Sequence, residues 1–169
     1  MRKLSSVLHV IDTINDRLGK IFSFIIVVMI GVMLWDIFVT YVFRAPTKWA
    51  VELTGLIFGT HFILGGAFVL LYRGHISMDV VYSRLSVRTR AILDVITFSL
   101  FLSFCCVLVW HGWELFSYSL KYLEHSVFAE IPFYPFKVMI PIGGSLLLLQ
   151  GLAKFIRDLT IVIRGEQII

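Results

Sequence analysis

Apolar residues along the chain gather in four long runs separated by short polar segments. The runs cover about residues 21–43, 49–72, 91–115 and 131–156, each near the roughly 20 residues that an α-helix needs to cross a hydrocarbon core of about 30 Å. This pattern predicts an all-α integral membrane protein with four transmembrane helices in one membrane domain, residues 1–169. The short connections leave no room for a soluble catalytic domain.

A different periodicity precedes the first run, in residues 4–20. Apolar residues recur there at three- and four-residue spacing, and polar residues fill the positions between them. The pattern predicts an N-terminal amphipathic helix that lies in the cytoplasmic membrane interface or packs on a partner, the alternative being a frayed extension of the first span. The apolar positions are Leu4, Val7, Leu8, Ile11, Ile14 and Leu18, and the polar ones are Asp12, Asn15, Asp16 and Arg17.

Composition agrees with a membrane protein, because 59% of the residues are hydrophobic and 15% are charged. The first apolar run is longer than the 7 to 15 residues, roughly, of a signal-peptide core, so we expect it to stay as a helix. Cys105 and Cys106 are adjacent in the third run. They can neither join distant segments nor form a four-ligand metal site, and we interpret both as packing residues.

The basic residues predict the orientation. Eleven of the 15 Lys and Arg residues fall on one side of the predicted topology and four on the other. By the positive-inside rule, both termini and the loop 73–90 are expected in the cytoplasm and the loop 116–130 in the periplasm. The net charge of +4 is thus explained by topology and anionic lipid, not by nucleic acid.

The second run carries a stripe of small residues. At 100° per residue, Glu52, Gly55, Gly59 and Gly66 fall on one side of the helix, and Gly55 and Gly59 form a GxxxG pair. Small residues let another helix approach closely. The spacing does not decide whether that helix belongs to this chain or to a partner.

Ionisable residues within the spans are functional candidates. Asp36, His111 and Glu114 are predicted to form a polar cluster near Glu52 in the outer part of the membrane. A proton or ion path is disfavoured because no carboxylate lies near mid-depth. A haem is disfavoured because His61 lies about 18 Å and His111 about 6 Å below the outer ends of their helices. No phosphate loop, nucleophile elbow or zinc spacing is present, so we expect no enzyme site, metal or cofactor.

A set of short motifs lies mainly around the second run. They are Val42-Phe43, Trp49-x-x-Glu52, Gly65-Gly66-Ala67, Arg73-x-His75-Ile76-x-Met78-Asp79 and Arg84-Leu85. With these motifs the chain resembles the small membrane subunit of tripartite ATP-independent periplasmic (TRAP) transporters, which also has four spans and cytoplasmic termini.

The resemblance implies a non-catalytic scaffold in the bacterial inner membrane. It would brace a large transmembrane subunit, which imports an organic acid, such as sialic acid or a C4-dicarboxylate, with sodium ions after delivery by a periplasmic binding protein. Residues implied to be structural or to contact the large subunit are Trp49, Glu52, Gly55, Gly59, Gly66, Arg73, His75 and Asp79. Polar residues available for docking of the binding protein are Lys48, Lys121, Glu124, His125 and Glu130.

Two other classes compete with the scaffold. An independent four-helix carrier or exporter would need a carboxylate in its first span that both sides can reach, and Asp36 is too near the outer face. A membrane anchor of a redox enzyme would need histidines at matching depth. Copurification with a large hydrophobic protein would favour the transporter subunit over both.

Overall fold

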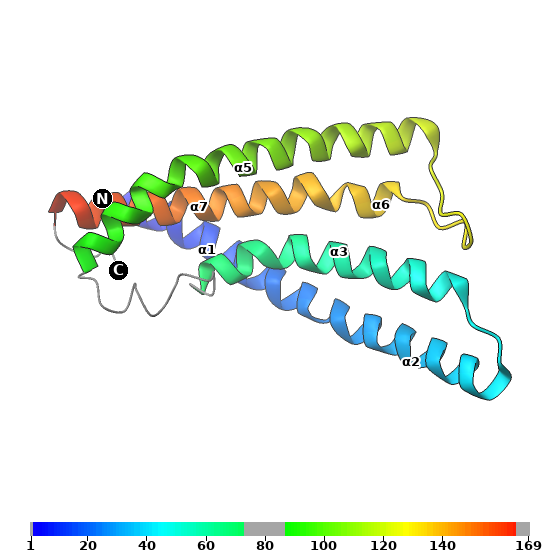
Figure 1. Cartoon of the computed structure of the whole chain (residues 1–169). Coiled ribbons are helices and arrows are strands. Elements are labelled where there is room, and N and C mark those ends of the chain that lie inside the picture. Colours follow the sequence, from blue (N-terminus) through cyan, green and yellow to red (C-terminus); the bar gives the residue numbers. More distant parts are fainter. Residues whose placement is uncertain (1, 73–86, 165–169) are drawn as a thin grey trace.

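The computed structural model describes residues 2–72 and 87–164, and within these ranges the chain is helical apart from short connections (Figure 1). The start of α1 and the end of α7 lie at one end of the molecule, and the α2–α3 and α5–α6 connections lie at the other. The helices are α1 (Arg2–Ser23), α2 (Ile25–Phe43), α3 (Lys48–Leu71), α5 (Val87–Tyr122), α6 (Tyr134–Lys137) and α7 (Met139–Arg164).

Four stretches are long and apolar enough to cross a membrane, which confirms the predicted fold class. They are Ser6–Phe43, Lys48–Leu71, Ile92–Tyr122 and Tyr134–Thr160. The first combines α1 and α2, which are separated at Phe24, where the backbone N–H of Phe24 bonds to the carbonyl of Ile21 at 3.2 Å.

The predicted N-terminal helix exists as α1, and it packs against α3 and α7 of the same chain. Leu8, Asn15 and Gly19 are buried on its inner side. Gly19 permits the approach to α3, because a Cβ there would lie 2.1 Å from the ring of Phe68. Part of the predicted apolar face of this helix therefore packs inside the chain, and part of it is exposed.

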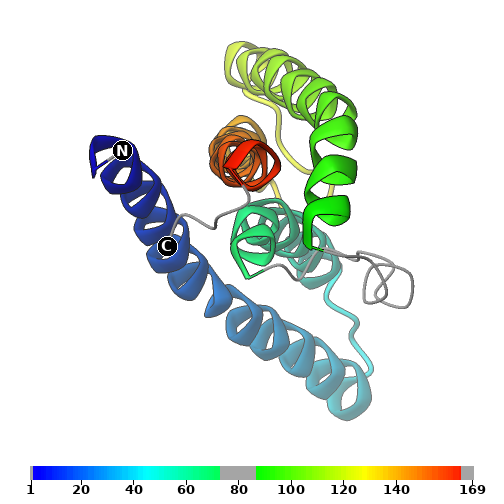
Figure 2. The ribbon, with the colours of Figure 1, turned by 90° about the vertical axis from the view of Figure 1, so that its left-hand side faces the viewer.

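Helix α7 is the centre of the bundle. It packs against both α5 and α3, whereas the main described contacts of α2 are with α3 and α1, and α2 has no buried residue (Figure 2). The core cluster joins three helices through Ala67, Leu70, Cys105 and Leu147. Cys105 is thus the packing residue that the sequence predicts, but the prediction is wrong for Cys106, which is exposed.

Helix ends differ from the hydropathy limits at the end of the molecule that holds the α5–α6 connection. Helix α5 continues to Tyr122, two turns beyond residue 115, so the predicted loop 116–130 becomes the connection 123–133. The predicted fourth span is divided into α6 and α7 at Val138. Hydropathy marks the segment that lipid surrounds, and a helix can extend beyond it. At the other end of the loop 73–90, residues 87–90 are already helical, and residues 73–86 lie outside the described ranges.

Candidate functional site

The GxxxG pair on α3 is an open face of this chain. A Cβ built on Gly55 or on Gly59 meets no described atom within 4 Å, while one on Gly66 would lie 3.7 Å from Leu147 of α7. Phe58 and Phe62 are exposed beside the pair, with ring centroids 6.3 Å apart. Within the described residues, the internal bundle uses only the inner end of the stripe.

Other glycines make the internal helix contacts. Added Cβ atoms would lie 2.7 Å from Ile140 at Gly112, 2.4 Å from Ile63 at Gly143 and 2.1 Å from Phe101 at Gly151. Sequence reasoning missed these positions. The seven-residue spacing of Gly144 and Gly151, which places both on one side of α7, was the available signal.

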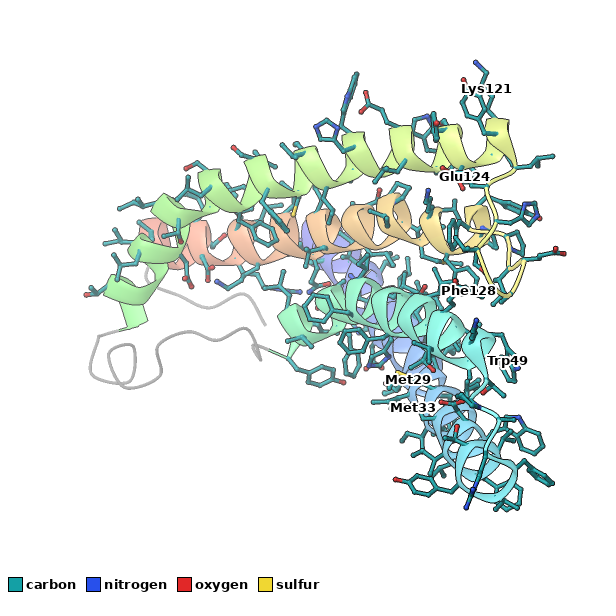
Figure 3. The ribbon with its side chains drawn as sticks, turned by 45° about the vertical axis from the view of Figure 1, so that its right-hand side comes forward. Met29, Met33, Trp49, Lys121, Glu124 and Phe128 are labelled. Carbon is teal, nitrogen blue, oxygen red and sulfur yellow. The ribbon has the colours of Figure 1, made fainter. Side chains whose placement is uncertain are left out.

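Trp49 and Glu52 lie in the first turns of α3, at the end of the molecule that holds the α2–α3 turn. The Trp49 side chain is exposed (Figure 3). Glu52 is half-buried, and its Oε2 is enclosed without a hydrogen-bond partner among the described residues. The Lys48 ammonium, one turn away, instead lies 4.9 Å from the ring centroid of Phe128. Glu52 thus keeps an unused acceptor near the α3 surface.

The predicted outer polar cluster consists of two separate groups in the structure. Asp36 accepts hydrogen bonds from the backbone N–H of Thr47, at 2.9 Å, and from its hydroxyl. His111 and Glu114 pair with each other on α5, with Nδ1 and Oε2 2.8 Å apart. Asp36 therefore stabilises the α2–α3 turn, and its described hydrogen bonds do not involve His111 or Glu114.

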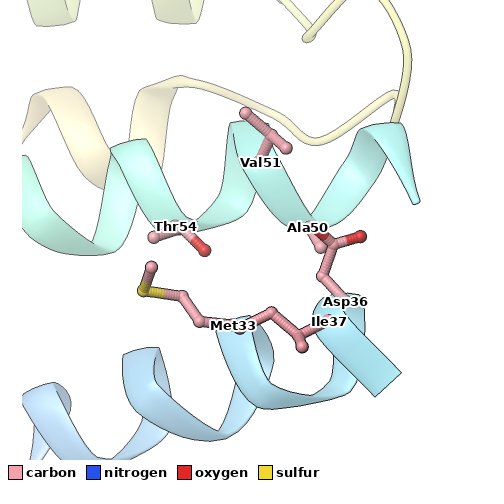
Figure 4. A pocket seen from close by; sticks show the side chains of 6 residues that line it. All are labelled: Met33, Asp36, Ile37, Ala50, Val51 and Thr54. Atoms are coloured by element: carbon pink, nitrogen blue, oxygen red, sulfur yellow. The ribbon is translucent and has the colours of Figure 1, made fainter. Parts of the chain in front are cut away.

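A small open cavity lies between α2 and α3 beside Asp36 (Figure 4). Its volume is about 170 Å³, below the roughly 300–1,000 Å³ of typical small-molecule sites. This cavity is therefore smaller than a typical ligand pocket. Its lining residues are Met33, Asp36, Ile37, Ala50, Val51 and Thr54.

The connection between α5 and α6, residues 123–133, is folded back on itself. The buried Ser126 accepts hydrogen bonds from the N–H groups of Ala129 and Ile131 at 3.1 and 3.4 Å. Lys137 of α6 donates to the Glu124 carboxylate, and this hydrogen bond holds the pKa of Glu124 below its usual value. The connection is therefore attached to the bundle.

This attachment changes the set of predicted docking residues. Glu124 is engaged by Lys137 inside the chain, so its carboxylate is less available to another protein. Lys48, Lys121, His125 and Glu130 are exposed, and Lys121 points away from the bundle at the end of α5 (Figure 3). The remaining polar surface contains both cationic and anionic groups.

A polar network that the sequence did not predict ties α1 to α7. Nδ2 of the buried Asn15 donates to Oε1 of the buried Gln150 at 2.6 Å, and Nε2 of Gln150 donates to Asp12 at 2.9 Å. Arg157 completes the network, with Nη2 2.5 Å from Oδ2 of Asp12. A Gln within the apolar run of α7 was the signal for it.

The two histidines considered for haem each have a partner in this chain. Nδ1–H of His61 donates to the carbonyl of Phe22 at 3.2 Å, which links α3 to the end of α1. His111 pairs with Glu114. No group of three or more His, Cys, Asp or Glu residues that could hold a metal ion occurs within residues 2–72 and 87–164. The remaining predicted interface residues, Arg73, His75 and Asp79, lie outside the described residues.

Comparison with known proteins gives consistent matches. A sequence model of the family described as "Tripartite ATP-independent periplasmic transporters, DctQ component" matches residues 29–161. The isethionate TRAP transporter permease protein DctMQ of Oleidesulfovibrio alaskensis is 28% identical over 116 residues, which are 67% of this chain. The matched segment is 18% of that protein, so the chain spans less than a fifth of its relative's length.

Proposed function

Because the chain belongs to the DctQ component family of tripartite ATP-independent periplasmic transporters, we propose that it is the non-catalytic scaffold subunit of such a transporter. It braces a large transmembrane subunit that imports an organic acid with sodium ions. The relative's name gives isethionate as its substrate; sialic acid and C4-dicarboxylates are the other candidates. Under this proposal the chain needs no cofactor, and sodium ions bind to the large subunit.

The open membrane surface of α3 carries the proposal. Gly55 and Gly59 have open space in front of them among the described residues. Helices associate in lipid by close van der Waals packing, for which glycines are suited. This surface supports a contact with a transmembrane helix of the large subunit, with Trp49, Glu52 and Phe62 around the glycines.

The scaffold has a direct test. Cells that lack this chain should lose sodium-dependent uptake even when the large subunit and the binding protein are present, and liposomes with this chain alone should take up nothing. Uptake by the chain alone would refute a scaffold role. Full uptake in cells that lack this chain would refute the claim that uptake requires it.

The contact itself is tested with a pair of glycine variants. Gly59→Leu adds a side chain to the proposed contact and should reduce copurification of the large subunit, because it separates the two backbones. Gly31→Leu adds the same side chain to an open position of α2 and is the control. If only the Gly31 variant lost the large subunit, the contact would lie on α2 and not on the α3 stripe.

The outer surface supports a second, transient contact with the periplasmic binding protein. This contact requires the α2–α3 turn and the connection 123–133 to face the periplasm and both termini to face the cytoplasm. A reporter fused after Ile169 tests this orientation, and its activity should appear only in the cytoplasm. Lys48, Lys121, His125 and Glu130 would make polar, salt-sensitive contacts there. Replacing both lysines by Glu should slow uptake while the membrane complex stays assembled. Unchanged uptake across a range of salt would exclude these residues.

A further inference from the structure

The cavity between α2 and α3 is apolar and opens to the surroundings of the two helices. Met33 of α2 and Thr54 of α3 face each other across it (Figure 4), and its lining is apolar apart from Thr54 and Asp36. An apolar cavity of about 150 Å³ stays dry and takes a molecule the size of benzene. The cavity of about 170 Å³ therefore has room for a short hydrocarbon segment.

The cavity lies at the depth of lipid acyl chains. Arg44 directly follows the apolar α2, and Lys48 begins α3, so both residues mark the ends of spans. At 1.5 Å per residue, Ile37 lies about 10 Å from Arg44 along α2, and Thr54 lies about 9 Å from Lys48 along α3. One leaflet contributes about 15 Å to a hydrocarbon core of about 30 Å. The cavity thus faces acyl chains when Arg44 and Lys48 lie among the headgroups.

Two cationic side chains lie on the headgroup side of this cavity. Arg44 and Lys48 are both exposed, and Asp36, which lines the cavity, accepts a hydrogen bond from the N–H of Thr47, the residue before Lys48. A guanidinium is permanently charged and matches phosphate oxygens with paired N–H groups. The amino end of the 24-residue α3 adds partial positive charge, which also favours a phosphate.

A partner helix on the glycine stripe would leave this cavity open. Ala50 is nine residues before Gly59, which places it about 180° away around α3, and Thr54 is about 140° away. On α2, the side chains of Met33 and Ile37 are 46% and 50% exposed. The cavity and the contact proposed for the large subunit therefore use different sides of α3.

We propose that α2, α3 and the turn between them form a binding site for one phospholipid. Its phosphate lies between Arg44 and Lys48, and a segment of one acyl chain fills the cavity beside Met33 and Thr54. Anionic headgroups are favoured, because each nearby Arg or Lys strengthens their binding about 5-fold. The lipid completes the packing of α2 on α3. The inference goes beyond the scaffold function and does not depend on it, since it uses this chain's own residues and its place in a membrane.

The first test measures lipid binding to the chain purified in mild detergent with whatever subunits accompany it. Phosphatidylglycerol is added in increasing amounts, and bound lipid is followed by native mass spectrometry. Arg44→Gln should weaken the binding about 5-fold. Lys121→Gln removes an exposed cation from a different helix, α5, and should leave the binding unchanged. Equal affinity of the Arg44 variant and the unaltered chain, or the same loss in both variants, would overturn the proposal.

A second test locates the acyl chain. A phosphatidylglycerol with a diazirine in the middle of one acyl chain, placed in membranes that hold the protein, should form an adduct at Met33. Thr54→Leu fills the cavity and should remove this adduct, whereas Thr60→Leu makes the same change on α3 outside the cavity lining and should keep it. An adduct that persists in Thr54→Leu would contradict the site.

The competing occupant is a protein side chain. A photo-crosslinking residue at Ile37 should react with phospholipid. Reaction with the large subunit instead would show that protein covers the cavity, and the lipid site would then be refuted while the scaffold function would stand.

Discussion

Replacing Gln150 by Leu tests how α1 is held against α7. Gln150 is 2% exposed and Asn15 is 3% exposed. Among the described residues, the Asn15 amide reaches another helix through its hydrogen bond to Gln150. Leu has a similar volume but no polar group. The variant therefore leaves the Asn15 amide buried without a partner, since its Oδ1 already lacks one.

The loss of stability in Gln150→Leu follows from the unpaired Asn15 amide. An unsatisfied buried polar group costs about 1–3 kcal/mol, while polar contacts between membrane helices average about 0.6 kcal/mol. The desolvation cost is the larger of the two, so we expect Gln150→Leu to destabilise the chain by about 1–3 kcal/mol. Asn15→Leu should have a comparable effect. The double variant, in which both amides are replaced by apolar groups, should be less destabilised than the sum of the two.

Buried Cys105 provides the assay. In a Cys106→Ser background, a thiol-reactive dye reports unfolding when Cys105 becomes exposed. At about 2–4 °C per kcal/mol, Gln150→Leu should lower the Tm by several degrees. Thr160→Val on the same helix is the control, because among the described residues the Thr160 hydroxyl donates to the carbonyl of Ile156 in its own helix, at 2.8 Å. Strictly additive effects of the two Leu substitutions would refute the reasoning.

Two further predictions concern other contacts. Gly143→Ala should destabilise the chain by about 1–3 kcal/mol, because its Cβ would lie 2.4 Å from Ile63 Cγ2, whereas Gly31→Ala should have no such effect; equal melting temperatures would contradict this. The Glu124 carboxylate has a lowered pKa because Lys137 donates to it, so its contribution is present above the usual pKa of 4.5 and is lost as the pH falls through the lower folded value. Glu124→Gln should therefore lower the Tm at pH 7 and make no difference at low pH, and a Tm difference that grew on acidification would exclude this sign.

The sequence by itself determined the fold class, the four spans and the family resemblance. Apolar length against membrane thickness is a local property, so each span could be found within its own segment. The limits of α5 were less accurate, because residues 116–122 are helical without being strongly apolar. Motifs around Trp49 and Gly66 were sufficient for the resemblance that the family match confirmed.

Only the tertiary structure decided what each helix face contacts. Spacing placed Gly55 and Gly59 on one side of α3, but the crossing of α3 with α7 left that side open and buried Gly143 instead. In the same way, Asp36 bonds to Thr47, and Gln150 meets Asn15 from 135 positions away. A sequence period fixes the direction of a side chain on its own helix. The helix that occupies that direction depends on the register and crossing of segments far apart in the chain, which no local pattern contains.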